Sequence, residues 1–248
     1  MSKAQTEPLQ PADYMTIAMA RIIRDGERVF HGVASPLPAV AIQLAKRLHA
    51  KNAVYLSIAG GVDAEPSELS RYSTAGANLR EGAIADFTLA DIFDLSARGG
   101  LDVAFLGGAQ IDAYGRVNLS AIGSFEKPKV RLPGGAGSAA LLPTAKRGIL
   151  WKTTHDRRSF VEKLDVITAA GNTEYVVTPI SVFKRSESDQ RLRLYTVFPN
   201  STFAEVVENT GFHVEKHVEF HPFNPITDEE LNILCEIDQN GSRFSEFR

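Results

Sequence analysis

The sequence predicts an α/β fold with a mostly parallel sheet flanked by helices. Short apolar runs typical of buried strands alternate with segments of helical periodicity, and glycines follow several of the runs. The run 103–106 ends at Gly107 and Gly108, and the run 53–58 leads into another glycine turn. A second glycine-rich loop follows at 134–137. Glycine loops at strand ends are what an α/β protein uses to hold a ligand by its main chain.

Length and composition fit one large domain. The chain has 248 residues, of which 44% are hydrophobic and 23% charged, close to an average globular protein. No linker rich in Pro, Ser or Gly divides it. Residues 1–11 are polar and carry two prolines. We therefore expect a flexible N-terminal arm over 1–11 and a single domain over 12–248.

The charge and cysteine content exclude several classes of protein. A net charge of −3 gives no electrostatic reason to expect a nucleic acid or an anionic membrane as partner. The single cysteine, Cys235, has no internal disulfide partner, and no stretch is of signal-peptide or membrane-spanning type. These features predict a cytoplasmic protein without a metal site. Cys235 lies in a helix-like run, so we expect a small buried hydrophobic residue there and not a nucleophile.

The elements of the N-terminal half follow from periodicity and capping residues. A helix is expected after Asp13 as N-cap, with Gly26 as its end, and Ser35 is expected to begin a second helix that continues to about His49. Strands are expected at 28–31 and 53–58, a long loop at 63–84, and a helix at 88–97.

In the C-terminal half, expected strands, turns and helices follow one another at shorter intervals. After the buried run 103–106, a turn is expected at 112–115. The segments expected as strands are 117–122, 148–153, 164–168, 176–183, 192–198 and 217–221. The fourth and fifth of these are expected to pair with each other. Helices are expected at 202–209 and from 227 onward.

The order and spacing of the motifs resemble the β-type subunit of the family I CoA-transferases, most of all the glutaconate CoA-transferase branch. The resemblance extends from about 12 to 238. It rests on G-G-A-Q-I-D-x-Y-G-x-V-N at 107–118, K-P-K-x-R at 127–131, G-G-A-G at 134–137, H-D-R-R-S-F at 155–160 and E-N-T-G-F at 208–212. It implies the CoA-transferase (NagB/RpiA-like) fold, an α-type partner subunit in an α2β2 or higher assembly, and a coenzyme A thioester as substrate with no permanently bound cofactor.

The resemblance also places one unexpected residue. In that family a glutamate at the end of the second strand attacks the acyl-CoA and carries the acyl group and then CoA covalently. The matching tetrapeptide here runs from Ser57 to Gly60, and Ile58 stands where the glutamate belongs. Because an isoleucine cannot attack a thioester, double-displacement transfer cannot run through this position.

The remaining candidates are ligand-holding residues. By resemblance, the main-chain N–H groups of one loop lie near the thioester carbonyl, where they would stabilise an oxyanion or enolate. Gln110 is expected either to bind the acyl part or to cap a turn, and His31 either to act as an acid or base or to satisfy local hydrogen bonds. The residues expected to bind CoA or the acyl group are Ser57, Gly60, Gly107, Gly108, Gln110, Gly134, Gly135, Ala136 and Gly137.

Other charged residues are weaker candidates. The acids downstream of Ile58 are Asp63, Glu65 and Glu68, which we interpret as solvated loop residues rather than as replacements for the missing glutamate. Arg157 and Arg158, together with Lys127, Lys129 and Arg131, are candidates for CoA phosphates or a substrate carboxylate, and otherwise solvated surface residues.

Two branches of the family imply chemistry other than transfer. One decarboxylates a methylglutaconyl-CoA-type substrate with a cysteine at the glutamate position, and the other hydrolyses a carbon–carbon bond in a ring-containing CoA thioester. The segment 32–37 and the spacing of Tyr55 and Gly60 are most similar to the decarboxylase branch. We therefore expect repurposed chemistry. The alternatives are CoA transfer with a nucleophile from elsewhere, or a non-catalytic subunit that completes the partner's site.

Overall fold

The computed structural model describes residues 8–69 and 75–247 and consists of two compact units. The first unit comprises 1–95, 100–103 and 224–248, and the second comprises 96–99 and 104–223. The single domain expected over 12–248 stays a prediction. Most of the expected arm, 1–7, lies outside the described residues.

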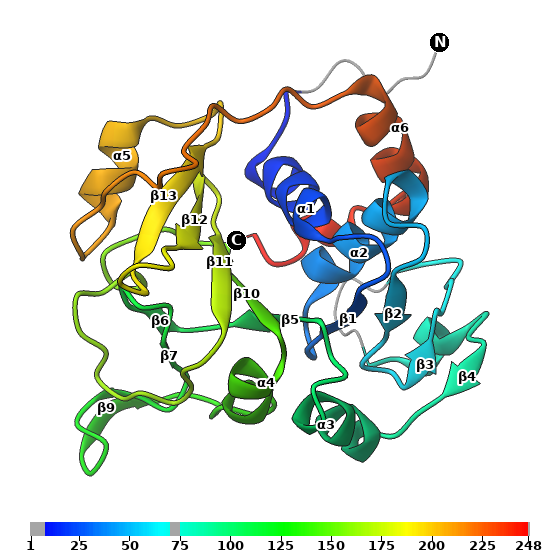
Figure 1. The fold of residues 1–248 in the computed structure, drawn as a ribbon, viewed down its shortest axis with the longest axis horizontal. Helices are drawn as coiled ribbons and strands as arrows, with labels where there is room; N and C mark the ends of the chain where they lie inside the picture. The colour runs from blue at the N-terminus through cyan, green and yellow to red at the C-terminus, as the bar shows by residue number, and fades with distance from the viewer. Residues whose placement is uncertain (1–7, 70–74, 248) are drawn as a thin grey trace. The chain divides into compact units, whose positions relative to one another are not determined.

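The first unit is a β-α-β arrangement extended by short strands (Figure 1). Its helices are α1 (Pro11–Ile22), α2 (Pro36–Leu48), most of α3 (Leu89–Ala97) and α6 (Asp228–Ile237), and its strands are β1 (Arg28–His31), β2 (Val54–Leu56), β3 (Gly61–Val62) and β4 (Ala85–Asp86). The strands are neighbours in the order β1-β2-β3-β4. β1 and β2 are parallel and joined through α2, whereas β3 pairs antiparallel with both β2 and β4.

Apolar helix faces build the core of this unit. Helices α1 and α2 lie side by side, and α6 packs against α2 (Figure 1). Met15 and Met19 on α1 and Leu37 and Leu44 on α2 are completely buried. The predicted positions of β1 and α2 are confirmed almost to the residue, because a strand, a proline-started helix and a second strand form a strong local signal.

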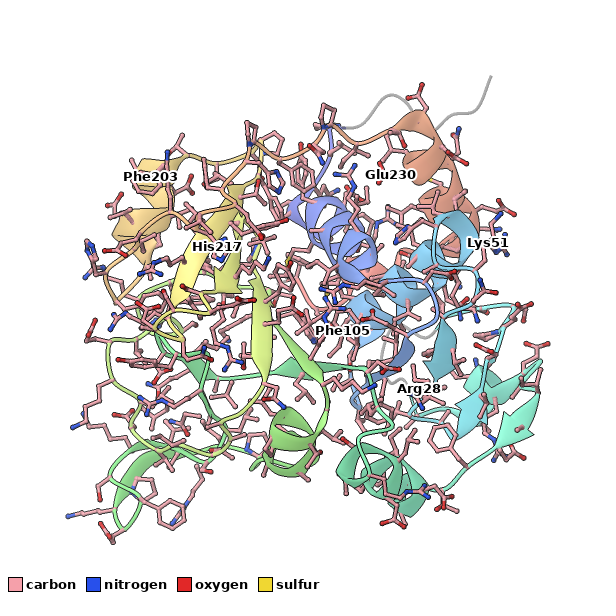
Figure 2. All side chains as sticks on the ribbon, in the orientation of Figure 1. Arg28, Lys51, Phe105, Phe203, His217 and Glu230 are labelled. Atoms are coloured by element: carbon pink, nitrogen blue, oxygen red, sulfur yellow. The ribbon has the colours of Figure 1, made fainter. Side chains whose placement is uncertain are left out.

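Side-chain bonds fix the helix ends. Asp13 is not the N-cap of α1: Gln10 takes that place, and the Asp13 carboxylate accepts the Gln10 N–H at 2.8 Å from the third helical position. The helix ends at Ile22, before the expected end at Gly26. In α6, Glu230 lies on the side that faces α1 and receives a hydrogen bond from Arg21 at 2.7 Å (Figure 2).

The region expected as a long loop at 63–84 contains a 3-10 helix at Ala77–Arg80, and its residues 70–74 lie outside the described part. A second 3-10 helix, Ser242–Phe244, follows α6.

The second unit holds its own run of hydrogen-bonded strands and two small hairpins (Figure 1). Its sheet strands are β5 (Val103–Gly107), β10 (Arg147–Trp151), β11 (Thr173–Val177), β12 (Ser181–Arg185) and β13 (Leu192–Val197), neighbours in the order β5-β10-β11-β12-β13. β10 and β11 are parallel, and the last three strands form an antiparallel meander. The α/β prediction is confirmed, with antiparallel strands beyond the parallel ones in each unit.

The remaining elements of this unit surround the glycine loops. They are the pairs β6 (Gln110–Ile111) with β7 (Val117–Asn118) and β8 (Ala121–Gly123) with β9 (Pro128–Arg131), and the helices α4 (Ser138–Thr144) and α5 (Phe203–Asn209). Phe105 on β5 is completely buried, whereas Phe203 at the start of α5 is 41% exposed (Figure 2).

Two expected strands are divided by side-chain and proline effects. The strand expected at 117–122 breaks into β7 and β8, because the Asn118 Oδ1 atom accepts the Ser120 N–H at 3.0 Å and turns the chain. The strand expected at 176–183 is two strands, because Pro179 has no N–H to donate and the Thr178 N–H bonds the Ser181 carbonyl across a turn.

Two other expected strands are absent. Residues 164–168 run irregularly, since the Thr168 N–H and hydroxyl bind residues of the β7–β8 segment. At 217–221 the Phe220 N–H bonds the His217 carbonyl oxygen at 2.9 Å and the chain turns.

Cys235 is exposed on α6 and not buried as expected. The preceding residue, Leu234, faces the core with 0% of its surface exposed, and the helical rotation of about 100° per residue carries Cys235 outward. Over the described parts of the chain, no helix is both long and apolar enough to cross a bilayer.

Candidate functional site

The chain turns tightly after β2, and Ile58 stands at the corner of the turn. The Gly60 N–H donates to the Ser57 carbonyl oxygen at 2.8 Å, which places Ile58 and Ala59 at the centre of a four-residue turn. Gly60 has a φ of 96°, and a Cβ there would lie 2.8 Å from the Phe87 carbonyl oxygen, so only glycine fits. Ile58 is half-buried. Position 58 is therefore presented at the carboxyl end of β2.

His31 lies at the same edge of the sheet, because β1 and β2 are parallel. Its Nε2 atom is 2.7 Å from the Tyr55 hydroxyl, and its Nδ1 atom is 3.0 Å from the Gly32 carbonyl oxygen. Burial lowers the pKa of His31 to about 4. The imidazole is thus neutral, with both ring nitrogens bonded and 0% of the residue exposed. These contacts match the expectation of a histidine that satisfies local hydrogen bonds.

Two of the three acids downstream of the turn, Asp63 and Glu68, have side-chain partners within the unit. Asp63 forms an ion pair with Lys46 at 2.5 Å. Glu68 accepts a hydrogen bond from the Asn240 amide after α6. Glu65 is exposed. Asp63 is therefore half-buried in an ion pair and not solvated as expected, whereas Glu65 and Glu68 are exposed as expected.

In the second unit the two glycine loops meet at β7. The Ala109 N–H, directly after Gly108, donates to the Asn118 carbonyl oxygen at 3.0 Å. The Gly134 N–H donates to the carbonyl oxygen of the next residue, Leu119, at 2.7 Å. Loops that lie about 25 residues apart in the sequence are thus bound to consecutive residues of one segment.

Close packing explains two of the glycines. A Cβ on Gly108 would lie 3.1 Å from the Val117 Cγ1 atom, and a Cβ on Gly135 would lie 2.9 Å from the Thr168 Cγ2 atom. Gly107 has no neighbour within 4 Å of the Cβ position. Gly108 and Gly135 are therefore required for steric reasons, whereas Gly107 is not.

The second loop presents main-chain donors. Gly134 and Ala136 have positive φ values of 94° and 41°, and in the described parts of the chain the N–H groups of Gly135, Ala136 and Gly137 have no acceptor. These three residues are half-buried or exposed. Unused N–H groups in a strained loop of this kind are suited to stabilise an oxyanion or enolate.

The Gln110 side chain is held by the protein at both ends. Its Oε1 atom accepts from the Asn118 Nδ2 atom at 2.7 Å, and its Nε2 atom donates to the Asp165 Oδ2 atom at 3.2 Å. Asp165 also accepts the Gly123 N–H at 3.1 Å. Gln110 is only 7% exposed, so these contacts correspond to the structural alternative expected for it.

Sequence reasoning missed Asp165. It is an exposed carboxylate that contacts both the Gln110 side chain and β8, and Thr168, three residues later, packs against Gly135. The segment was expected to be a strand, and its contacts are made to residues more than 40 positions earlier. No local pattern in the sequence identifies Asp165.

The basic candidates lie at the surface of the second unit. Lys127, Lys129 and Arg131 are exposed on the β8–β9 hairpin, where the Arg131 guanidinium lies 4.8 Å from the Phe125 ring centre.

The H-D-R-R-S-F and E-N-T-G-F motifs pack against each other. The His155 Nε2 atom is 3.0 Å from the Thr210 hydroxyl, and the Arg157 Nε atom donates to the Glu208 carbonyl oxygen at 2.7 Å. Arg158 pairs weakly with Asp156 at 3.2 Å. Burial lowers the pKa of His155 to about 4. The two motifs therefore pack together through His155 and Arg157, while the Arg158 side chain is 92% exposed.

The predicted residues thus form two groups. Position 58, its turn and His31 belong to the first unit, and both glycine loops, Gln110 and Asp165 belong to the second. β7 belongs to a two-stranded antiparallel pair with β6, and the glycine loops bound at its end can present main-chain N–H groups to a carbonyl group.

Comparison with known proteins identifies the family to which this fold belongs. The family described as coenzyme A transferase matches residues 12–209, and the chain belongs to this family. The resemblance found in the motifs is thereby confirmed.

Three curated relatives span nearly the whole chain. The B subunit of the 3-oxoadipate CoA-transferase of Pseudomonas knackmussii is 30% identical, and the alignment covers 90% of each chain. The B subunit of the glutaconate CoA-transferase of Acidaminococcus fermentans is 28% identical over 86% of this chain and 87% of its own. The IpdB subunit of the cholesterol ring-cleaving hydrolase of Rhodococcus jostii is 27% identical over 96% of this chain and 95% of its own.

Among solved structures, the decarboxylase AibA/AibB contains a chain with 31% identity and a TM-score of 0.89, covering 96% of this chain and 99% of that one. The predicted CoA-transferase fold is confirmed by the family match and by the likeness to the solved glutaconate coenzyme A-transferase of Acidaminococcus fermentans, which has 25% identity and a TM-score of 0.83 over 94% of this chain and 96% of that one. Transferase, hydrolase and decarboxylase are all represented among the relatives.

Proposed function

We propose that this chain is the β-type subunit of a heteromeric enzyme that acts on an acyl-CoA thioester, with decarboxylation or carbon–carbon hydrolysis of a carboxylated acyl-CoA as its reaction. The partner is an α-type subunit of the same family, in an α2β2 or higher assembly. Relatives named as B subunits, and a solved decarboxylase with two named components, support this assignment.

The observation that carries the proposal is the residue at position 58. The turn after β2 presents this position, and the residue there is an isoleucine, whose side chain has no nucleophilic atom. The glycine loops that would hold the thioester are intact, and N–H groups of Gly135 to Gly137 have no acceptor in the described residues. Loss of the nucleophile with retention of the donors favours chemistry that needs a stabilised enolate but no covalent intermediate.

The main-chain donors suit both reactions. In decarboxylation, the electron pair of the bond to the leaving CO2 moves toward the thioester carbonyl, and the resulting enolate oxygen accepts hydrogen bonds from the loop before a proton reaches carbon. In hydrolysis of a carbon–carbon bond, water adds to a carbonyl carbon and the electron pair of the broken bond moves in the same direction. The donors reduce the free energy of the charged oxygen in either case.

The test is a product assay on the assembled complex. The chain is combined with its α-type partner and offered a panel of enoyl-CoA acids and ring-containing CoA thioesters without any acceptor acid. We expect CO2 or a ring-opened product while the thioester stays intact. Exchange of CoA that depends on an added acceptor acid would contradict the proposal.

A second candidate function is ordinary CoA transfer, and Asp165 is the observation in its favour. This exposed carboxylate is bound to the Gln110 side chain, which follows the first glycine loop, and to the Gly123 N–H of β8, and a carboxylate is the kind of nucleophile that covalent transfer requires. Attack of the carboxylate on the thioester carbon would release CoA thiolate and leave a mixed acyl anhydride. Attack of the thiolate on the Asp165 carbonyl carbon of that anhydride then forms the enzyme thioester and releases the acyl group as a free carboxylate. Borohydride reduction followed by mass spectrometry would detect that thioester as an alcohol at residue 165. An unmodified residue 165 after turnover excludes this route.

We further infer that the protein works in the cytoplasm with CoA thioesters as substrates and without a permanently bound cofactor. Its single cysteine, Cys235, has no second cysteine to pair with inside the chain. The absorption spectrum and metal content of the purified complex test the cofactor part: a stoichiometric chromophore or metal would contradict it.

A further inference from the structure

We propose that Thr168 is a positioning residue that fixes the second glycine loop, 134–137, and thereby directs the main-chain N–H groups that this loop offers to the thioester carbonyl. Its hydroxyl acts on the loop through Leu119, and its methyl group lies against Gly135. The catalytic part of this inference rests on the proposed function. The structural part concerns contacts inside the second unit only.

The hydroxyl of Thr168 holds the residue to which the loop is bound. Its Oγ1 atom accepts the Leu119 N–H at 2.9 Å, and the Leu119 carbonyl oxygen accepts the Gly134 N–H at 2.7 Å. The Oγ1 atom also lies 2.7 Å from the Ser120 Oγ atom. Two hydrogen bonds in series therefore connect this side chain to the first residue of the loop. Without the hydroxyl, the Leu119 N–H loses its acceptor and Leu119 is oriented less firmly.

The methyl group of Thr168 contacts the loop directly. A Cβ on Gly135 would lie 2.9 Å from the Thr168 Cγ2 atom, so the two residues pack without room for a further carbon. The Gly135 carbonyl oxygen accepts the Ser138 N–H at 2.7 Å, which closes a four-residue turn around Ala136 and Gly137. Thr168 therefore packs against the residue at which this turn begins.

The backbone holds Thr168 beside β7. Its N–H donates to the Val117 carbonyl oxygen at 2.9 Å, and the Val117 N–H donates to the carbonyl oxygen of the next residue, Ala169, at 2.9 Å. A side chain branched at Cβ has few χ1 rotamers, so the hydroxyl and the methyl group keep fixed directions once the backbone is fixed. Serine would retain only the hydroxyl at this position, and valine only the carbon branches.

The conformation of the loop explains why support from outside is required. Ala136 has a φ of 41°, in the left-handed region that a residue with a Cβ rarely adopts. Such a conformation persists only when the surrounding contacts determine it. In the described residues the N–H groups of Gly135, Ala136 and Gly137 have no acceptor, so no hydrogen bond of their own fixes their direction. Their direction depends on the contacts that Thr168 makes and on the Ser138 N–H.

Hydrogen exchange of the full chain tests the structural part. Thr168→Val removes the hydroxyl and keeps the shape. Thr173→Val is the matched control, because the Thr173 hydroxyl donates to the Gly115 carbonyl oxygen at 2.7 Å and the Thr173 Cγ2 atom likewise lies against that glycine. We expect the amides of Leu119 and Gly134 to exchange at least about tenfold faster in Thr168→Val and within about twofold of wild type in the control. Unchanged exchange of both amides in Thr168→Val, or equal acceleration in the control, overturns the inference.

Kinetics of the complex with the α-type subunit test the catalytic part. With any thioester of the panel that the wild-type complex converts, Thr168→Val should lower kcat at least about tenfold and leave KM within about twofold. The reason is that displaced donors bind the charged oxygen less well, whereas CoA binding is unchanged. Thr168→Ser, which loses only the methyl contact, should lower kcat about threefold, and Thr173→Val should keep kcat within about twofold of wild type.

The outcomes separate the positioning role from a general loss of stability. A wild-type kcat in Thr168→Val, or an equal decrease in Thr173→Val, overturns the positioning role. If Thr168→Val does not assemble with the α-type subunit, Thr168→Ser decides, and a wild-type kcat in that variant overturns the role. If the wild-type complex converts no thioester, the proposed function fails, and the exchange result still decides whether Thr168 fixes the loop.

Discussion

Glu246 is a carboxyl group held against the start of a helix. Its Oε2 atom lies 3.5 Å from the Leu37 N–H, and Pro36 and Pro38 on either side of Leu37 have no N–H to offer. Burial raises the pKa of Glu246 to about 7, and the bond from Leu37 lowers it only in part. Folding therefore favours the protonated form of Glu246.

We predict that Glu246→Gln stabilises the protein at alkaline pH. Because the folded pKa is raised, the stability linked to this group is complete below pH 4.5 and is lost as the pH rises through about 7. Glutamine does not ionise, so the variant should gain about 1–3 kcal/mol at pH 8 and about zero at pH 4, after allowance for partial exposure. Urea unfolding at both pH values measures this. The exposed Glu65→Gln should show no such difference, and a gain equal at both pH values would contradict the mechanism.

Asn118 joins the two glycine loops through its side chain as well as its backbone. Its Nδ2 atom donates to the Gln110 Oε1 atom and to the Ala121 carbonyl oxygen, both at 2.7 Å, and the residue is 0% exposed. Removing the amide leaves buried acceptors without a donor, which costs more than an exposed hydrogen bond.

We predict that Asn118→Leu destabilises the chain by about 2–4 kcal/mol and abolishes activity, since the shape is retained but the donors are lost. Denaturant unfolding and the product assay measure the two effects. The exposed Asn200→Leu, which loses one bond of 3.3 Å to Pro179, should change stability by less than about 0.5 kcal/mol. Equal effects in the two variants would contradict the role given to the buried network.

At the scale of elements, the C-terminal helix α6 depends on its N-terminal cap. The Thr227 hydroxyl accepts the Glu230 N–H at 3.2 Å, and the Glu230 carboxylate accepts the Thr227 N–H at 2.8 Å. Glu230 also pairs with Arg21 of α1. One residue thus caps α6 and binds it to α1.

We predict that Thr227→Ala costs about 1 kcal/mol, because the Glu230 N–H loses its side-chain acceptor, whereas the N–H of residue 227 still donates to the Glu230 carboxylate. Thermal unfolding should show a decrease of about 2–4 °C. Thr154→Ala serves as control, because Thr154 is exposed and caps no helix. A decrease of the same size in the control would show that the capping box contributes nothing.

The division of one expected strand into β7 and β8 shows that a contact outside an element can end it. The apolar alternation from Val117 to Ile122 is typical of one strand, yet the Leu119 N–H donates to the Thr168 hydroxyl at 2.9 Å and leaves the ladder. That partner lies 49 residues later. The division is useful for the site, because it leaves the Leu119 carbonyl oxygen to bind the second glycine loop.

At the scale of the whole molecule, two histidines, one buried and one half-buried, make the stability decrease in acid. Burial lowers the pKa of His31, in the first unit, and of His155, in the second, to about 4. Between pH 6.5 and 4 the unfolded chain binds protons that these folded imidazoles do not. Stability therefore falls as the pH decreases through this window.

We predict a loss on the order of 2–3 kcal/mol for each of the two rings between pH 7 and pH 4. Because Glu246 acts in the opposite direction, the measurement is made in the Glu246→Gln chain by urea unfolding. Replacing His31 or His155 by Gln should each flatten the pH dependence. His213→Gln should leave it unchanged, since that side chain is 78% exposed. Retention of the full pH dependence in both the His31 and the His155 replacements would contradict this origin, because carboxyl groups with lowered pKa values, such as Asp156 and Glu230, account only for the remainder.

Much of the fold follows from the sequence because the signals are local. The strand from Arg28 to His31 and the helix α2 were predicted nearly at their observed bounds, since prolines, polar helix ends and apolar periodicity act within a few residues. The motifs around the glycine loops likewise predicted the CoA-transferase fold. That Ile58 occupies the position of the family's catalytic glutamate could be inferred from the sequence only through the resemblance.

Other features were decided only by tertiary structure. Asp165 beside Gln110, the binding of both glycine loops to Asn118 and Leu119, and the exposure of Cys235 each depend on residues that lie far apart in the chain or on which face of a helix is covered. Sequence patterns report the preferences of neighbouring residues, whereas these contacts form when distant segments bury their apolar surface together and the polar groups carried with them must find partners. The sequence thus determined the elements and the missing nucleophile, and the tertiary structure determined which polar groups hold the turn and the loops.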